Sequence, residues 1–378
     1  MKFRLSHGVT QFSPQILVTC RSGGVTGFGS APLYKRPFKT LFDIWRDLRP
    51  WLISENAEDV AELRQRLNLR YADRYSSLLY AVDGALWDME GRLQSRSVAE
   101  LLGTIRRERI PLTLQSFIED SIVVVEQVQS LVARGVTQFK LKIGTSVNAD
   151  IDMVKQVRTA CGDAVTIKLD GNGCYQLEEA LVAGKAFADL GVSLWEEPLA
   201  WTSWSELRTL RSEVPLPLML DESCQTRGST IAAIENDALD VLNVKLTRVG
   251  GLTQAQSLVA LCDSAGVGVS IGCSEDLGAA MAAIIHLSAT VENLVGTEGI
   301  GWERLGFDSG SPSCEIGPDG SAKVSTSPGL GVEYDAEALA EASSRLGFEV
   351  HQMDGGVNLR WLAESVRNGI VRRWANRN

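Results

Sequence analysis

The sequence lacks the features that mark several common classes of protein. No apolar run approaches the roughly 18 residues that cross a bilayer, and the first residues, MKFRLSHGVTQFSPQILVTC, hold no apolar core of a signal peptide. Basic residues are outnumbered, giving a net charge of -10, whereas a protein that follows a phosphate backbone is basic. We therefore expect neither a membrane nor a nucleic acid as partner.

Cysteine and histidine offer no metal or redox motif. The seven cysteines form no CxxC pair, which favours reduced thiols over a disulfide framework or a zinc site, and we expect a cytoplasmic protein. Histidine occurs only at His7, His286 and His351. His286 lies within the helical pattern MAAIIHLSA, and we interpret it as a packed or capping residue. With 44% hydrophobic residues among 378, the chain has ample material for a large core.

From residue 110 onward, short strand-like runs alternate with helical stretches. Segments such as LEEALVAGKAFADLG have apolar residues at helical spacing and end in Gly, so the strands should pair in parallel through helical crossovers. Eight such runs predict a β/α barrel, because a doubly wound sheet requires a glycine fingerprint that LQSFIEDS lacks. The runs are IPLTLQSF, QFKLKIG, AVTIKLDGN, VSLWEEPL, LPLMLDES, DVLNVKLTRVGG, GVGVSIGC and ENLVGTEG.

The two ends of the chain depart from this alternation of strands and helices. Residues 1–109 contain antiparallel strand patterns followed by helical ones, which predict an α+β capping domain ahead of a barrel at 110–345. The Gly-rich stretch RSGGVTGFGSAPLYKRPFKT is expected to form a loop. Residues 346–378 complete the capping domain. Their apolar stripe predicts a docked terminal helix, with Leu359, Leu362, Val366, Ile370 and Trp374 on one face.

Three consecutive barrel strands end in carboxylates. The third run ends in Asp170, the fourth in Glu196 and the fifth in Asp221. Active sites of β/α barrels lie at the C-terminal ends of the strands, so the three acids should meet at one rim. Each acid alone is also explained as a helix cap or surface turn, but three in register would repel unless a divalent cation binds. Carboxylates without nearby His or Cys favour Mg²⁺, with Mn²⁺ as the alternative.

Lysines lie on the strands that flank these acids. Lys140 and Lys142 share one face of the second strand, and Asn243 and Lys245 share one face of the sixth. The adjacent charges of Lys140 and Lys142 are expected to lower lysine pKa values toward neutrality, so that a lysine takes a proton from carbon while the metal stabilises the enediolate. We count Lys140 with Lys142 and Lys245 as candidate catalytic residues. The alternative is that these lysines are salt-bridged partners of the acids, which would give Lys140 a purely electrostatic role.

The ordered motifs resemble those of the enolase superfamily over nearly the whole chain. YAVDGALWDMEGRLQSRSVAELLG is similar to the family's cap helix, and KLKIG, DGN, EEP, DES, KLTRVGG and SPGLGVEYD follow in the family's order. The KxK pair and the strand-six lysine resemble the muconate-lactonizing subgroup. A mechanism of the mandelate racemase type uses a histidine on strand seven, and SIGCSED has none.

The resemblance implies a modified (β/α)7β TIM-like barrel behind an N-terminal α+β capping domain, and a homo-oligomer. It implies that Lys142 and Lys245 are the acid/base pair on opposite faces of the substrate. It also implies that the Mg²⁺ ligands are Asp170, Glu196 and Asp221. Supporting or substrate-binding roles are expected for Asn172, Glu222, Asn243, Glu298, Trp302 and one of the strand-seven acids, Glu275 or Asp276.

The eighth strand separates the subgroups. Dipeptide epimerases carry Asp-x-Asp there, whereas this chain has GTEGIGW, in which Glu298 resembles the muconate cycloisomerase pattern. Trp302 would favour an ammonium or apolar group of the substrate.

The leading hypothesis is a Mg²⁺-dependent racemase or epimerase of an amino-acid-like carboxylate. The alternatives are a cycloisomerase or a β-eliminating dehydratase that uses the same enolate, and a non-catalytic barrel. Degenerate members of such a family usually lose a ligand or a lysine, and none is missing here.

Overall fold

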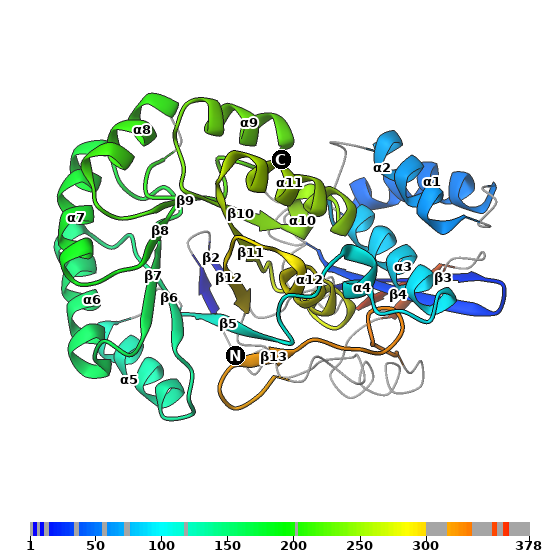
Figure 1. Ribbon diagram of the computed structural model, residues 1–378, viewed down its shortest axis with the longest axis horizontal. Helices are drawn as coiled ribbons and strands as arrows, with labels where there is room; N and C mark the ends of the chain where they lie inside the picture. The colour runs from blue at the N-terminus through cyan, green and yellow to red at the C-terminus, as the bar shows by residue number, and fades with distance from the viewer. Residues whose placement is uncertain are drawn as a thin grey trace, which may run out of the picture.

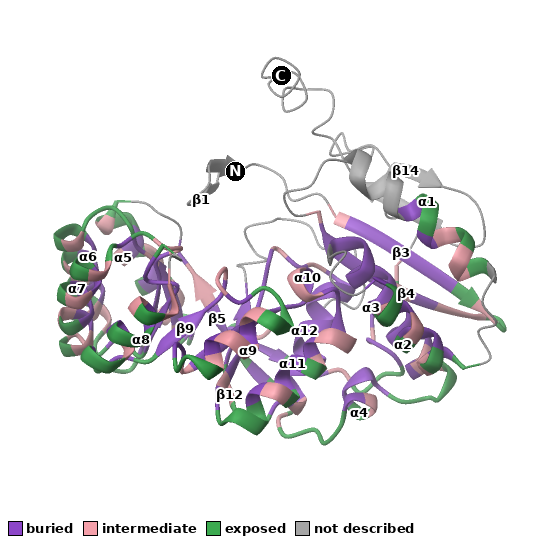
Figure 2. Cartoon of the chain, turned by 90° about the horizontal axis from the view of Figure 1, so that it is seen from above, coloured by how far each residue is buried: buried purple, intermediate pink, exposed green. Residues whose placement is uncertain are grey.

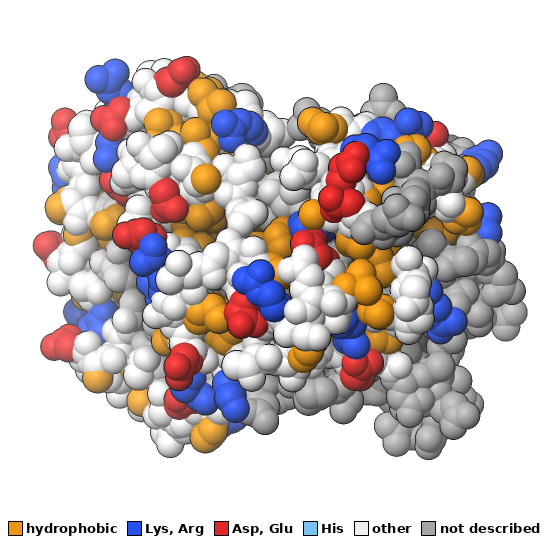
Figure 3. Space-filling model, turned by 45° about the vertical axis from the view of Figure 1, so that its right-hand side comes forward, with side chains coloured by type: hydrophobic (Ala, Val, Ile, Leu, Met, Phe, Trp, Pro, Cys, Tyr) orange, Lys and Arg blue, Asp and Glu red, His pale blue; other side chains and the backbone are white. Residues whose placement is uncertain are grey.

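The computed structural model describes residues 3–5, 8–10, 15–33, 38–54, 59–71, 76–116, 120–200, 203–299, 316–334, 350–353 and 358–362. Its main body is a closed barrel of eight parallel strands, beside which the capping domain lies (Figure 1). Within the described ranges, no helix is both long and apolar enough to span a membrane. On the face drawn in Figure 3, acidic and basic side chains are interspersed.

The barrel strands follow one another in chain order, and the last pairs with the first. Thr297, Glu298 and Gly299 pair in parallel with Leu112, Thr113 and Leu114, which closes the barrel. This arrangement confirms the predicted fold, and all eight predicted runs form its strands. The strands are β5 (Arg109–Gln115), β6 (Gln138–Lys142), β7 (Thr166–Asp170), β8 (Leu194–Glu196), β9 (Leu218–Leu220), β10 (Val241–Lys245), β11 (Gly268–Gly272) and β12 (Leu294–Gly299).

Helices connect successive strands and cover the outside of the barrel (Figures 1 and 2). Local sequence sets where they begin and end. In α6, for example, the Ser146 hydroxyl accepts a hydrogen bond from Ala149 N, and Gly162 follows the last turn at φ +70°. The connecting helices are α5 (Ser121–Val132), α6 (Val147–Cys161), α7 (Leu177–Asp189), α8 (Trp204–Glu213), α9 (Arg227–Glu235), α10 (Leu246–Val249), α11 (Leu252–Ala265) and α12 (Ala279–Thr290).

An apolar floor fills the barrel below its C-terminal rim. Leu194, Met219 and Val241 are buried and form a hydrophobic cluster separate from the main core. Each lies two residues before a polar residue at the rim, namely Glu196 in β8, Asp221 directly after β9 and Asn243 in β10. Because side chains alternate along a strand, each pair points to the same side of the sheet. The polar layer at the rim therefore lies on a dry base, which strengthens the electrostatic interactions above it.

The capping domain combines helices with a four-stranded antiparallel sheet in the order β14-β15-β3-β4. The sheet strands are β3 (Gln15–Ser22), β4 (Val25–Pro32), β14 (Val350–Met353) and β15 (Asn358–Leu362). The helices are α1 (Phe38–Ser54), α2 (Val60–Tyr71), α3 (Ser76–Leu93) and α4 (Val98–Leu102). A separate hairpin joins β1 (Phe3–Leu5) to β2 (Gly8–Thr10), and β13 (Ser321–Lys323) pairs antiparallel with β5.

The prediction of a Gly-rich loop after residue 20 is wrong for residues 25–32. These residues form β4, which pairs with β3 along its full length. A Cβ atom at Gly27 would overlap the carbonyl oxygen of Ala85, and one at Gly29 would overlap that of Ala81. The glycines therefore allow α3 to pack directly on the strand backbone. Glycine within a strand often marks such a close approach of another backbone, rather than a loop.

The prediction of a terminal helix is wrong where the chain is described. Leu359 and Leu362 lie in β15, which pairs antiparallel with β3 from Asn358 to Leu362. Residues 363–378, and with them Val366, Ile370 and Trp374, lie outside the described residues. Two apolar positions three residues apart fit a helix as well as a strand, and pairing with β3 decides between them.

His286 joins the barrel to the capping domain. It is buried in α12, its Nδ1 accepts a hydrogen bond from Ala99 N at 3.0 Å, and its Nε2 lies 3.3 Å from the carbonyl oxygen of Leu330. The histidine thus caps the first turn of α4, which confirms its predicted packing or capping role. Burial lowers its pKa from 6.5 to about 4.

We expect the burial of His286 to make stability depend on pH. The unfolded chain takes up the proton near pH 6.5 and the folded protein only near pH 4, so the free energy of unfolding should fall as pH drops through this interval. The contribution of His286 to this loss is about 3 kcal/mol. His286→Gln should remove it, as measured by urea unfolding at several pH values. The difference between the two proteins at pH 8 calibrates the packing effect. Parallel pH profiles for the two would contradict the assignment.

Candidate active site

The three predicted carboxylates lie together at the C-terminal rim of the barrel. Asp170 pairs with Glu196 across β7 and β8, and Asp221 follows the end of β9. Their exposed fractions are 1%, 0% and 1%. Three carboxylates so deeply removed from water require cations or hydrogen-bond donors beside them.

Lys140 is surrounded by acids. Its Nζ lies 2.9 Å from Glu196 Oε2, 2.5 Å from Glu298 Oε1 and 3.2 Å from Asp170 Oδ2, and the residue is 1% exposed. A single ammonium therefore neutralises carboxylates from β7, β8 and β12. This position makes Lys140 an electrostatic partner of the acids, as the alternative interpretation of the sequence held.

Lys142 and Lys245 occupy opposite ends of the row of carboxylates. Lys142 Nζ lies 2.5 Å from Asp170 Oδ2 and 2.7 Å from Asn172 Oδ1. Lys245 Nζ lies 2.7 Å from Asp221 Oδ2. Because Glu196 lies on the strand between Asp170 and Asp221, the two lysines bracket the acids. Both are salt-bridged in this structure, as the alternative also held.

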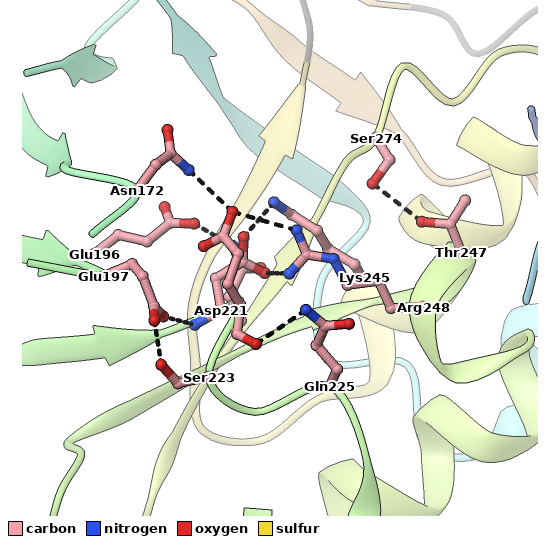
Figure 4. Close-up of polar contacts among 12 residues, drawn as sticks. Asn172, Glu196, Glu197, Asp221, Ser223, Gln225, Lys245, Thr247, Arg248 and Ser274 are labelled. Atoms are coloured by element: carbon pink, nitrogen blue, oxygen red, sulfur yellow. Dashed lines mark hydrogen bonds and ion pairs between the residues drawn. The ribbon is translucent and has the colours of Figure 1, made fainter. Parts of the chain in front are cut away.

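A second set of polar contacts lies around Asp221 (Figure 4). Arg248 donates through Nη1 to Asp221 Oδ1, and its Nη2 lies 3.5 Å from Glu222 Oε1. Asn172 Nδ2 donates to the same oxygen of Glu222 at 3.0 Å. Asp221 is thus held between Lys245 and Arg248, and Glu222 connects the ends of β7 and β9.

Asn243 and Glu298 complete the inner layer. Asn243 Nδ2 donates to Glu196 Oε1 at 2.9 Å and to Glu298 Oε1 at 3.2 Å, and Cys273 N donates to Glu298 Oε2 at 3.3 Å. Asn243 Oδ1 is buried without a partner in the described part of the chain. Both oxygens of Glu298 are therefore occupied by the protein itself.

The expectation that lysine pKa values fall toward neutrality is wrong for Lys140 and Lys245. Burial lowers the pKa of Lys140, but the charges of Glu196, Glu298 and Asp170 outweigh it and hold the pKa well above the usual range. The pKa of Lys245 is raised because Asp221 outweighs burial in the same way. The sequence suggests repulsion between neighbouring lysines, whereas in space each lysine lies closest to carboxylates.

The carboxylates respond unequally to this environment. Burial and the charge of Asp170 raise the pKa of Glu196 well above its usual range. The pKa values of Asp170 and Asp221 are lowered, because their lysine partners outweigh the effect of burial. The cations present in the chain therefore do not fully compensate the buried negative charge at Glu196.

The structure separates the two strand-seven acids. Asp276 is 5% exposed and its Oδ2 accepts a hydrogen bond from Ser274 N at 2.6 Å, whereas Glu275 is half-buried at φ +68°. Burial raises the pKa of Asp276 to about 6, against smaller lowerings by the hydrogen bonds of Ser274 N, Tyr80 and Cys273. Trp302 lies outside the described residues.

Three site residues were missed by the sequence analysis. Arg248 follows Lys245 within KLTRVGG, and a second cation one turn after the strand was the available signal. Glu197 accepts hydrogen bonds from Asp221 N at 2.8 Å and from the Ser223 hydroxyl, and thereby fixes the turn that carries Asp221.

The third missed residue is Lys168, two residues before Asp170. It lies in the barrel with its Nζ 3.2 Å from Thr113 Oγ1. Burial lowers the pKa of Lys168.

The donor atoms are of the chemical type that a hard divalent cation prefers. Carboxylates from three consecutive strands are oxygen ligands of the type that Mg²⁺ binds, and Glu222 Oε2 beside them is buried without a partner in the described ranges. Their oxygens point toward lysine and arginine, and no three His, Cys, Asp or Glu side chains of the described residues converge closely enough to hold a metal. The ligand assignment therefore stays a prediction.

Both parts of the chain match models of known protein families. Residues 2–103 match the model of the mandelate racemase / muconate lactonizing enzyme N-terminal domain, and residues 123–338 match the enolase C-terminal domain-like model. The N-succinyl-L-Arg/Lys racemase of Bacillus cereus is 25% identical over 350 residues, which cover 90% of this chain and 93% of that protein.

A cycloisomerase is similar to a comparable extent. Muconate cycloisomerase 1-1 of Acinetobacter lwoffii is 33% identical over 263 residues, which cover 68% of each chain. The crystal structure of muconate lactonizing enzyme from Pseudomonas fluorescens, complexed with muconolactone, has a TM-score of 0.83 at 25% identity. The superposition covers 90% of this chain and 94% of that one.

The surroundings of Lys140 predict that its loss destabilises the fold. Lys140→Met leaves Glu196 and Glu298 buried without their shared cation, so the free energy of unfolding should fall by roughly 3–5 kcal/mol at pH 8. The double variant Lys140→Met/Glu298→Gln, which removes one of the orphaned charges, should recover part of this loss. Chemical unfolding of the three proteins measures both values. A loss below about 1 kcal/mol, typical of surface pairs, would contradict the assignment.

Proposed function

The chain belongs to the mandelate racemase and muconate lactonizing enzyme family, and on that premise we propose that it is an isomerase that removes the proton α to a substrate carboxylate. The family match confirms the resemblance to the enolase superfamily inferred from the ordered motifs. Within the family, we propose racemization or epimerization of an amino-acid-like acid.

The position of the two lysines carries this proposal. Lys142 at the end of β6 and Lys245 at the end of β10 lie on either side of the carboxylates of β7, β8 and β9. A carboxylic acid bound over these strands would have its α-carbon between two amines. Removal of a proton on one side and its return on the other inverts the configuration, and a lysine on each side is the minimum that this requires.

The lysines must differ in protonation for the reaction to proceed. One must be neutral to accept the α-proton, and the other must be an ammonium to return one. In the described structure both ammonium groups contact carboxylates, so the base must leave its aspartate and lose its proton when substrate binds. The pair would then share one proton, and the direction of the reaction would depend on which lysine holds it.

We propose Mg²⁺ as the cofactor, held by Asp170, Glu196 and Asp221. When bound, the ion would place positive charge against the substrate carboxylate, where negative charge develops as the α-proton leaves. The chain's own residues prepare this site. Arg248 and the turn held by Glu197 orient Asp221, and Asn243 orients Glu196.

Cycloisomerization of an unsaturated diacid is the second candidate. It would form the same enolate by closing a ring from one carboxylate onto the double bond. A lysine would then give a proton to the α-carbon instead of removing one. The similarity to a muconate cycloisomerase and the glutamate at position 298 favour it. Such a reaction needs acid/base chemistry on one face of the substrate, so a single lysine suffices, and this difference separates the two candidates.

Loss of one lysine should separate inversion from exchange. We expect Lys245→Ala to lower racemization at least about 100-fold, because general acid–base groups typically contribute factors of this size. It should still exchange the α-proton of the enantiomer that faces Lys142. Lys142→Ala should show the mirror behaviour with the other enantiomer. Chiral chromatography measures inversion, and proton NMR in D₂O measures exchange.

A cycloisomerase or a β-eliminating enzyme would give a different result. If it uses Lys142 alone, Lys245→Ala would retain much of its activity and invert nothing. Exchange of the same enantiomer by both lysine variants would contradict the placement of the lysines on opposite faces.

Binding of Mg²⁺ should stabilise the native protein. A ligand that binds only the folded state at 100 times its dissociation constant adds about 2.7 kcal/mol, so the thermal midpoint should rise with added Mg²⁺. Asp170→Asn should abolish this rise. Asp152→Asn, which removes an exposed carboxylate from α6, serves as the matched control and should respond as wild type does. An unchanged wild-type midpoint would favour a non-catalytic barrel.

A further inference from the structure

The helices that follow the barrel strands differ in how their first turns are capped. Four of them begin after a residue whose side chain accepts a hydrogen bond from a backbone N–H of the first turn. These residues are Asp120 before α5, Ser146 before α6, Ser203 before α8 and Thr226 before α9. In contrast, α11 begins after Gly251 and α12 after Gly278, and glycine has no side chain that could cap a helix.

Residues of the capping domain cap these two helices instead. Asp83 of α3 accepts a hydrogen bond through Oδ2 from Thr253 N, in the first turn of α11, at 3.1 Å. The Ser30 hydroxyl of β4 accepts one from Ala280 N, in the first turn of α12, at 2.9 Å. Because α11 and α12 follow β10 and β11, the capping domain completes the part of the barrel that carries Lys245.

Asp83 binds the start of α11 at more than one point. The residue is 0% exposed, and its Oδ1 accepts hydrogen bonds from the Thr253 hydroxyl at 2.6 Å and from Asn68 Nδ2 at 3.1 Å. Gly251 approaches the same carboxylate so closely that a Cβ atom there would lie 2.5 Å from Asp83 Oδ2. The carboxylate therefore fixes the segment 251–253 against α3.

A single helical turn connects this segment to Lys245. α10 begins directly after the lysine, and the N–H groups of Gly250 and Gly251 both donate to the carbonyl oxygen of Leu246 at 3.0 Å, which closes the turn. α10 also contacts α3 (Figure 1). A displacement of residues 251–253 would therefore move the backbone beside Lys245.

Lys142 is held by residues of the barrel itself. Its backbone N–H donates to Ser116 Oγ at 3.2 Å, and Gly144 N donates to Asp150 Oδ2 at 3.1 Å. Asp150 lies in α6, whose first turn Ser146 caps. The two lysines of the proposed acid/base pair thus depend on different supports.

We propose that Asp83 is a positioning residue for Lys245, and that docking of the capping domain against α10 and α11 sets the activity of the Lys245 face of the site. Asp83 is buried and acts through the turn, not by contact with the substrate. This inference rests on the proposed function, because it takes Lys245 as the acid/base group for one enantiomer. It goes beyond that function by assigning the two faces of the reaction to different supports.

The test compares the two faces in the full-length protein. Asp83→Ala removes both oxygens that bind Thr253, and Asp120→Ala, which removes the capping aspartate of α5, is the matched control. The separate D and L enantiomers of N-acetyl amino acids with apolar, basic and acidic side chains are incubated with Mg²⁺ in D₂O, and α-proton exchange is followed by NMR. Lys142→Ala and Lys245→Ala identify the enantiomer that each lysine serves.

The measured quantity is kcat/KM for exchange at the Lys245 face divided by that at the Lys142 face. We expect Asp83→Ala to lower this ratio about tenfold to hundredfold, because a misplacement of about 1 Å can cost a factor of about 100 in rate. A smaller folded fraction lowers both rates alike and cancels. Asp120→Ala should lower the thermal midpoint and leave the ratio unchanged. If Asp83→Ala is unfolded at the assay temperature, Asp83→Asn, which keeps one acceptor oxygen, should lower the ratio by a smaller factor.

Amide hydrogen exchange, measured by mass spectrometry, tests the support without substrate. Residues 246–256 should lose protection in Asp83→Ala, whereas residues 138–161 should keep it. A wild-type ratio in the Asp83 variant, or unchanged protection of residues 246–256, overturns the role of Asp83 and leaves the proposed function standing. Absence of exchange by wild type with every acid, or exchange of one enantiomer only, overturns the proposed racemization and this inference together.

Discussion

The burial of several carboxylates at the rim of one barrel is the constraint on which the rest of the site depends. Asp170, Glu196 and Asp221 are almost fully removed from water, and desolvation alone would keep them neutral. Lysines from β6 and β10 and an arginine after β10 compensate Asp170 and Asp221, while Glu196 stays under-compensated. The proposed divalent cation follows from this imbalance.

The barrel and the main site residues could be predicted because they depend on local pattern and topology. Alternation of strand and helix signals fixes parallel pairing, and parallel pairing brings all C-terminal strand ends to one rim. Residues at strand ends, such as Asp170 and Glu196, could then be placed together although 26 positions separate them. No further local signal was needed beyond the strand assignment and the residue types at the strand ends.

The features that were missed depend on contacts between distant segments. The glycines of β4 looked like a loop because the backbone of α3, more than 50 residues away, is what requires them. The pKa values of Lys140 and Lys245 were predicted in the wrong direction because Glu298 and Asp221 are their nearest partners in space. Asp276 could be chosen over Glu275 only once burial of the turn was known, since adjacent acids in a turn carry no periodic signal.

The most direct test of the account is the location of a metal in crystals grown with Mn²⁺, which has an anomalous signal that Mg²⁺ lacks. The account predicts a single anomalous peak bounded by the carboxylates of Asp170, Glu196 and Asp221, with the ammonium groups of Lys142 and Lys245 on either side of it. A peak at other residues, or none at a saturating Mn²⁺ concentration, would contradict the proposal that these carboxylates form a metal site for a carboxylic acid substrate.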